Sequence, residues 1–99
     1  MHKLRERNVV SHLVERIKYE LRGEVRKCSW IGRKHAPDTV VFFRGVYFVE
    51  LKRPGKDARE GQAREHKRMR KHGADVRVID TIEKVDEFIR ELTEKDRLK

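Results

Sequence analysis

Three charged residues of the chain have types and spacing that suit metal-dependent chemistry on a phosphate: Asp38, Glu50 and Lys52. Asp38 opens one apolar run, Thr39 to Phe43, and a second run, Val46 to Val49, leads directly into Glu50. Short β-branched and aromatic runs with a glycine-containing break between them predict a β-hairpin. Because Glu50 and Lys52 are two residues apart, their side chains project from the same face of the second strand.

The pairing of this hairpin decides whether the charged residues meet. With a turn centred near Arg44-Gly45, antiparallel pairing places Asp38 opposite Leu51, within diagonal reach of Glu50 and Lys52. Two carboxylates about 4 Å apart repel by roughly 4 kcal/mol at an effective dielectric constant near 20, and a divalent cation relieves this better than a lysine does. Carboxylate oxygens, waters and a backbone carbonyl suit Mg²⁺. The alternative interpretation is a solvated ion pair at a hairpin end.

Periodic apolar residues predict the elements before the hairpin. A first helix with its stop at Gly23 is indicated by Val10, Leu13, Val14, Ile17 and Leu21. Glu20 lies beside Ile17 at the margin of this apolar stripe, where it is either an ordinary boundary residue or directed toward a site. A strand is expected over Glu24 to Trp30, followed by a loop over 31–37.

The elements after the hairpin are a helix, a strand and a helix. Asp57 with Glu60 resembles a capping box that opens a helix ended by Gly73. Helical spacing gives this helix a weak inner face of Ala58, Gln62, His66 and Met69, and a basic stripe of Arg64, Lys67, Arg68 and Lys71 on the opposite, outer side. A strand follows over Asp75 to Ile79, and a last amphipathic helix begins after a cap at Asp80 or Thr81. The predicted fold is therefore α/β, with a mixed sheet flanked by helices.

Composition predicts one basic domain over residues 1–99. Only 36% of the 99 residues are hydrophobic and 43% are charged, so the core is thin and association would help the fold. The net charge of +9 favours a polyanionic partner. No apolar run approaches the roughly 20 residues that a membrane-spanning helix needs. The residues after Met1 also lack the apolar region of a signal peptide. Cys28 is the single cysteine, which excludes a disulfide framework. We expect a cytoplasmic protein of a bacterial or phage-infected cell.

The pattern Pro37-Asp38 with Glu50-Leu51-Lys52 resembles the signature of the PD-(D/E)xK nucleases. Within that superfamily the chain is similar to the VRR-NUC family, through Glu20 in the leading helix, Gln62 in the following helix and the segment Val76 to Asp80. One departure is Ala36, close to the place where that family often has a glycine.

The resemblance implies a restriction-endonuclease-like αβββαβ core with an added C-terminal helix, and a Mg²⁺- or Mn²⁺-dependent endodeoxyribonuclease. Asp38, Glu50 and the carbonyl of Leu51 would bind the metal. Lys52 would act on the attacking water, Glu20 would hold a second metal or a water, and Gln62 would fix Lys52 or the phosphate. Small stand-alone members of the family occur in phages and prophages. They resemble Holliday-junction resolvases acting as homodimers, which implies a branched DNA substrate and a homodimer here.

Basic residues on both sides of the hairpin are candidates for DNA contacts, with solvated surface as the alternative for each. They are Arg33, Lys34, His35, Arg53, Lys56, Arg64, Lys67, Arg68 and Lys71. Two other functions stay open: a non-catalytic basic DNA-binding module on the same fold, and a general nuclease for DNA or RNA. Nothing in the sequence identifies a residue that would recognise the 2′-hydroxyl of RNA.

Overall fold

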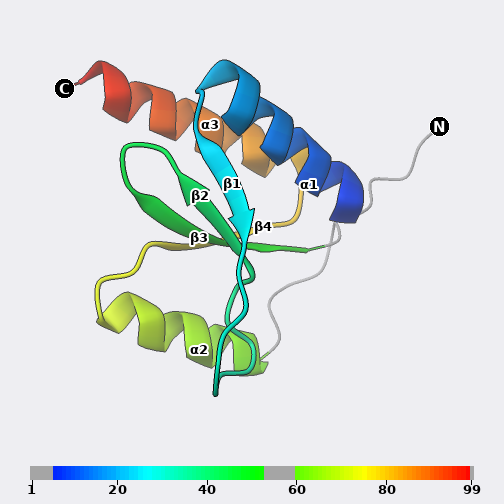
Figure 1. The fold of residues 1–99 in the computed structure, drawn as a ribbon, viewed down its shortest axis with the longest axis vertical. Coiled ribbons are helices and arrows are strands. Elements are labelled where there is room, and N and C mark those ends of the chain that lie inside the picture. Colours follow the sequence, from blue (N-terminus) through cyan, green and yellow to red (C-terminus); the bar gives the residue numbers. More distant parts are fainter. Residues whose placement is uncertain (1–5, 53–59, 99) are drawn as a thin grey trace.

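The computed structural model describes residues 6–52 and 60–98, which form four strands and the helices around them (Figure 1). In chain order the elements are α1 (Glu6–Glu15), η1 (Arg16–Glu20), β1 (Glu24–Lys27), β2 (Thr39–Phe42), β3 (Val46–Leu51), α2 (Glu60–Lys71), β4 (Val76–Ile79) and α3 (Ile82–Arg97). This order confirms the predicted α/β class and the αβββαβ core with its C-terminal helix. The predicted Asp57 cap of α2 lies outside the described residues.

The sheet is mixed and its strands follow the chain order β1-β2-β3-β4. β1 and β3 are antiparallel to β2, whereas β4 is parallel to β3 and is reached through α2. The β2–β3 register pairs Thr39 with Val49 and Phe42 with Val46, so three residues form the turn. Continued by one pair, this register sets Asp38 opposite Glu50. The predicted partner, Leu51, is wrong by one residue.

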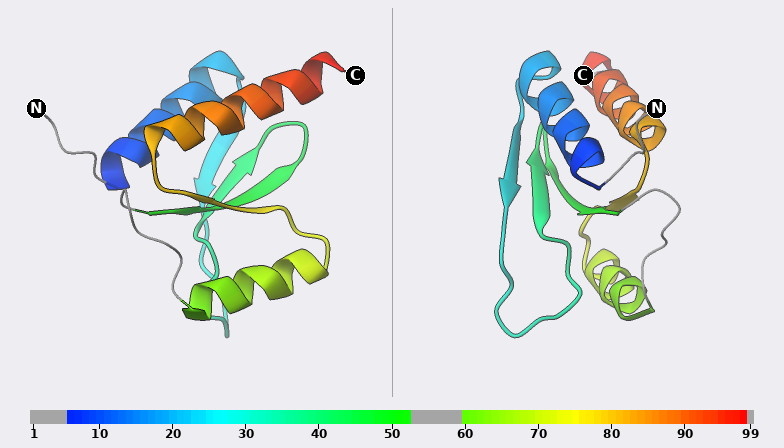
Figure 2. Two further views of the ribbon diagram at one scale, coloured as in Figure 1. Left: turned by 180° about the vertical axis from the view of Figure 1, so that it is seen from behind. Right: turned by 90° about the vertical axis from the view of Figure 1, so that its right-hand side faces the viewer.

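The two faces of β3 meet different helices, because successive side chains point to opposite sides of a strand. Tyr47, Val49 and Leu51 are buried in the core that α1 and α3 form with one face. Phe48, Glu50 and Lys52 point to the opposite face. Figures 1 and 2 show α1 and α3 side by side on one side of β3 and β4, and α2 on the other. Charged residues at the end of β3 are therefore covered by α2.

The first helix ends differently from the prediction. Its last turn, η1, is a π-helical turn, in which hydrogen bonds span one residue more than in an α-helix. Arg22, with φ 60°, has the left-handed conformation expected of Gly23. Gly23 serves a close approach instead, since a Cβ there would lie 2.7 Å from the carbonyl oxygen of Phe42. The end of η1 is thereby held against the turn end of the β2–β3 hairpin.

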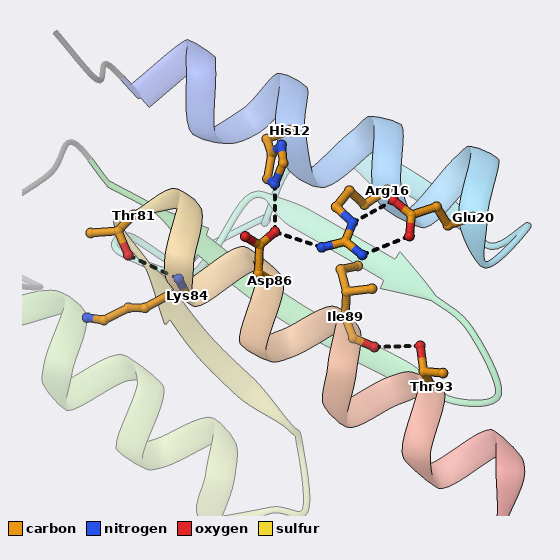
Figure 3. A network of polar contacts seen from close by, with 8 residues as sticks. All are labelled: His12, Arg16, Glu20, Thr81, Lys84, Asp86, Ile89 and Thr93. Atoms are coloured by element: carbon orange, nitrogen blue, oxygen red, sulfur yellow. Dashed lines mark hydrogen bonds and ion pairs between the residues drawn. The ribbon is translucent and has the colours of Figure 1, made fainter.

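The last helix begins with the predicted cap. Thr81 Oγ1 accepts a hydrogen bond of 3.0 Å from the backbone N–H of Lys84 (Figure 3). Such a cap satisfies one of the N–H groups that the first turn of a helix leaves unpaired. The alternative cap, Asp80, is instead 2.8 Å from the ammonium of Lys84. No helix among the described residues is long and apolar enough to span a bilayer.

The outer strands of the sheet carry charged side chains. On β1, Glu24, Arg26 and Lys27 are exposed. On the other side, the Arg70 guanidinium donates hydrogen bonds of 2.6 and 3.2 Å to the carbonyl oxygen of Val76 in β4. A long arginine from α2 thus occupies a backbone acceptor of β4, the last strand in the sheet order of the described residues.

Candidate active site

Glu50 and Lys52 form the part of the site that β3 positions. Their charged groups are 3.7 Å apart, Glu50 Oε2 to Lys52 Nζ. Both side chains are largely buried, 13% exposed for Glu50 and 17% for Lys52. The backbone N–H of Lys52 donates to the carbonyl oxygen of Ile79 at 2.9 Å, so parallel pairing with β4 fixes the end of the strand. A carboxylate and an ammonium are therefore held together beneath α2.

Asp38 approaches the same place from β2. Its backbone carbonyl accepts a hydrogen bond of 2.9 Å from Cys28 N–H, and the preceding carbonyl, of Pro37, accepts one of 2.6 Å from the Trp30 indole. These bonds fix the Pro-Asp segment at the entry to the strand. The Asp38 side chain is 62% exposed, with Lys27 Nζ 3.8 Å away. In the continued register Asp38 and Glu50 are directly opposite, and such residues project from the same face of an antiparallel pair.

The helix α2 covers the site and brings His66 close to Glu50. His66 is buried, and its Nε2 lies 3.7 Å from Glu50 Oε1, too far for a hydrogen bond. Among the described residues this nitrogen has no hydrogen-bond partner. Burial, and secondly the charges of Arg70 and Lys52, lower the pKa of His66, so the ring is neutral at pH 7. Gln62 precedes it by one helical turn and is half-buried.

The sequence had placed Gln62 and His66 on the inner face of this helix, which the structure confirms. It did not associate His66 with Glu50. The spacing of Gln62 and His66 provided the signal: they are four residues apart, and positions i and i+4 share one helix face, so His66 faces the same strand end as Gln62.

Glu20 does not belong to this group. Its carboxylate accepts two hydrogen bonds from Arg16, at 2.6 and 2.7 Å, and Arg16 also donates to Asp86 of α3 at 2.7 Å (Figure 3). His12 contacts the same Asp86 oxygen at 2.7 Å. The arginine hydrogen bond is the main reason that the pKa of Glu20 is lowered. Glu20 therefore holds Arg16, and it is Arg16 that joins the first helix to α3, away from the charged end of β3.

Two features explain why the expectation for Glu20 fails. The π-helical turn changes the helical phase, so a wheel with a constant 3.6 residues per turn no longer gives the direction of residue 20. The chain also reaches Glu20 near Phe42, at the opposite end of β2 from Asp38. At about 3.3 Å per residue, the two ends of that strand are separated by roughly 13 Å.

Comparisons with known proteins identify the family of the chain through one solved structure. No model of a known protein family matches the chain, and no relative was found among curated proteins. A solved structure described as a "VRR_NUC domain" is similar with a TM-score of 0.76 and 41% sequence identity, covering 86% of this chain and 94% of that one. The chain belongs to the VRR_NUC family. The predicted family is confirmed, and with it a fold of the PD-(D/E)xK nuclease type.

The acidic residues of this VRR_NUC domain suit a hard divalent cation. In the described ranges no three His, Cys, Asp or Glu side chains gather closely enough to hold a metal. Two opposed carboxylates, Asp38 and Glu50, are nevertheless the oxygen donors that Mg²⁺ accepts, because this ion keeps several waters and needs few protein ligands. The Leu51 carbonyl is the third predicted ligand. The residue types fit the ion, and its coordination is left to the proposal below.

The predicted DNA contacts of the VRR_NUC domain are distributed over two exposed surfaces. Exposed side chains on the loop before β2 are Arg33, Lys34 and His35, and those on α2 are Arg64, Lys67, Arg68 and Lys71. Arg53 and Lys56 lie outside the described residues. Exposure agrees with the predicted basic stripe on the outer side of α2, and contact with DNA stays a prediction.

Proposed function

We propose that the protein is a Mg²⁺- or Mn²⁺-dependent endonuclease that hydrolyses phosphodiester bonds of DNA. The observation that supports this most is the convergence of Asp38, Glu50 and Lys52 at one end of adjacent strands, beneath a helix that supplies Gln62 and His66. Membership of a nuclease family gives the reaction class, and the net charge of +9 favours a polyanionic substrate.

Asp38, Glu50 and the carbonyl of Leu51 would hold the metal. When bound there, Mg²⁺ or Mn²⁺ supplies Lewis-acid polarisation of the phosphoryl group and lowers the pKa of its water. Asp38 faces solvent and reaches an incoming strand first. Glu50 is largely buried, so its carboxylate is presented in a fixed direction. Its neighbour His66, being neutral, does not compete with a cation for the negative charge.

Lys52 and Gln62 would act on the substrate and on water. The ammonium of Lys52 lies 3.7 Å from Glu50, close enough for one water or phosphate oxygen to contact both groups. From there Lys52 orients the attacking water and stabilises the charge that develops on the phosphate oxygens. Gln62, on the inner face of α2, donates to the phosphate or holds Lys52. Glu20 has no role in this proposal.

The substrate that we propose is branched DNA, cut by a homodimer. Two copies related by a two-fold axis present two equivalent sites at a fixed separation. A four-way junction has matching symmetry, whereas a linear duplex must be deformed to meet both sites. The thin core of the chain is compatible with association. The exposed Trp30 packs against Phe48 with ring centroids 5.6 Å apart.

A cleavage assay tests the reaction and separates the alternatives. Purified protein is incubated with labelled four-way junction, flap, linear duplex and RNA duplex, each with Mg²⁺, Mn²⁺ or EDTA. Cleavage of DNA that depends on the metal is expected, with the junction cut fastest. Equal rates on junction and linear DNA would leave a general DNA nuclease, and comparable cleavage of RNA would remove the DNA restriction. Binding without any cleavage would establish the non-catalytic module.

Light scattering tests the assembly separately. We expect a mass of twice 11.9 kDa at micromolar concentration. A monomeric mass for the free protein, together with a complex that contains one protein chain per junction, would contradict the homodimer. The assignment of the metal-binding residues would not be affected.

A further inference from the structure

A cleft beside the proposed active site lies between the loop before β2 and the first half of α2. Its positively charged lining residues are Arg33, Lys34, Arg64 and Arg68. Glu65 also lines it and supplies the negative charge among the described lining residues. The loop continues directly into Pro37 and Asp38, and α2 carries Gln62 and His66 on its other side. The two elements that form the cleft therefore also carry residues of the proposed active site.

The loop is seated on α2 by a close contact between His35 and Gly61. A Cβ at Gly61 would lie 2.9 Å from the imidazole ring of His35, so only glycine allows the ring to approach the helix this closely. The loop bends through two residues with left-handed backbones, Gly32 at φ 71° and His35 at φ 70°. Such a conformation costs a residue other than glycine free energy, and here it accompanies the docking of His35 on α2.

Glu65 binds two of the arginines from within the cleft. Its side chain is only 8% exposed, with Oε1 2.5 Å from Arg68 Nη1 and 3.7 Å from Arg33 Nη1. A buried carboxylate requires such partners, because its removal from water is costly. Both guanidinium groups stay about half exposed. Each guanidinium has five N–H donors, so donors are left to face the cleft after Glu65 is satisfied.

We propose that this cleft is a phosphate-binding site for one phosphate of the substrate strand next to the cleaved bond, and that Glu65 is the residue that positions Arg33 and Arg68 for it. The proposal rests on the nuclease function above and adds the place where the strand is held. Four cations and Glu65 leave the cleft positive, and planar guanidinium groups match phosphate oxygens through paired hydrogen bonds. Glu60 pairs with Arg64 at 2.9 Å in an exposed position, where such a pair is weak.

This assignment divides the basic stripe of α2 into two parts. Arg64 and Arg68 line the cleft, whereas Lys67 and Lys71 are exposed on the same helix and do not line it. Each part consists of two cations four residues apart. Substituting one part or the other removes the same charge from the same helix, and provides a matched pair of variants.

Binding in EDTA tests the cleft without requiring hydrolysis. A fluorescently labelled duplex is titrated with wild type, R64Q/R68Q and K67Q/K71Q over a series of salt concentrations. We expect affinity to fall about tenfold in R64Q/R68Q and about twofold in K67Q/K71Q, with the salt slope of R64Q/R68Q shallower by about 0.9 for the phosphate lost. Equal effects in the two variants would overturn the proposal and return the whole stripe to a diffuse basic surface.

Glu65→Gln tests the positioning role by the sign of its effect. The substitution removes one negative charge, so general electrostatic attraction to DNA predicts tighter binding. Loss of the fixed arginines predicts binding roughly threefold weaker. Thermal unfolding of each variant shows whether it is folded. If Glu65→Gln fails to fold, the comparison of R64Q/R68Q with K67Q/K71Q still decides whether the cleft binds a phosphate. Tighter binding by a folded Glu65→Gln protein would refute the positioning role of Glu65.

Duplexes with 5′-phosphate or 5′-hydroxyl ends identify the source of the phosphate. A loss in R64Q/R68Q with both ends indicates an internal phosphodiester, and a loss confined to the phosphorylated end indicates a terminal phosphate. The nuclease function is judged independently by cleavage in Mn²⁺. Normal binding by R64Q/R68Q with metal-dependent cleavage by wild type would reject the cleft alone, and weakened binding with no cleavage by wild type would reject the nuclease alone.

Discussion

Replacing Asp38 by Asn should separate metal binding from folding. The substitution removes one of two facing carboxylates and keeps the shape of the side chain. In EDTA it relieves the repulsion of Glu50, which is about 0.8 kcal/mol for charges about 5 Å apart in a water-like dielectric. This is less than the value for a desolvated pair, because the Asp38 side chain is 62% exposed. The substitution also removes the exposed contact with Lys27 at 3.8 Å, which contributes about 0.5 kcal/mol or less. The two changes nearly cancel, so the melting temperature without metal should move by only a few degrees.

With metal the two proteins should differ strongly. An ion that binds only the folded state stabilises wild type by about 2.7 kcal/mol at a concentration 100 times its Kd. For a domain of this size that raises the melting temperature by roughly 10–20 °C. Asp38→Asn should lose most of this rise and its cleavage activity together.

Differential scanning calorimetry in EDTA and across a Mn²⁺ titration measures both effects. Glu24→Gln is a matched control, since it neutralises an exposed carboxylate on β1 that is paired with Arg26. The control should keep the full rise. An Asp38→Asn protein with the rise of wild type would refute the assignment of Asp38 as a ligand, and so would cleavage at the wild-type rate.

Three further predictions concern other residues. Lys52→Ala should lower turnover sharply yet keep the Mn²⁺-dependent rise in melting temperature, since lysine acts on water and phosphate; loss of that rise would contradict this role. Glu20→Gln should cleave at nearly the wild-type rate and lose little stability, because its pair with Arg16 is exposed and screened by solvent, and an inactive but folded variant would restore Glu20 to the site. Glu91→Gln should cost about 1 kcal/mol at pH 7, because hydrogen bonds from Arg77 lower the pKa of Glu91 in the folded state. That stabilisation is fully present above pH 4.5, the ordinary pKa of a glutamate side chain, and is lost as the pH falls through the lower pKa of Glu91 in the folded state. Denaturant unfolding curves of wild type and Glu91→Gln should therefore converge in acid.

The hairpin illustrates what the sequence predicts well. Two apolar runs and a glycine-containing break were enough to bring Asp38 and Glu50 to one end of two strands. The register was wrong by one residue because the turn contains Phe43, Arg44 and Gly45, with Arg44 at φ 53°. A left-handed arginine is not visible in composition, and the turn residues alone did not distinguish two-residue from three-residue loops.

The helices show where such prediction fails. A constant helical period gave the right inner face for α2, and Gln62 and His66 lie there. The same period failed at Glu20, because a π-helical turn changes the phase and apolar spacing does not reveal it. Tertiary contacts such as the seat of His35 on Gly61 join residues far apart in sequence. No local pattern predicts them.

The charged residues on the outer strands of the sheet restrict how two copies of the chain can associate. An open outer strand is a template on which another chain can add, and natural proteins discourage this with charged residues. Here β1 exposes Glu24, Arg26 and Lys27, and Arg70 occupies the Val76 carbonyl on β4. A continuous sheet running through both subunits would bury those charges or displace that arginine. Association through helices, loops or a sheet face would leave those charges and that arginine in place, and edge-to-edge aggregation is opposed at both outer strands of the described sheet.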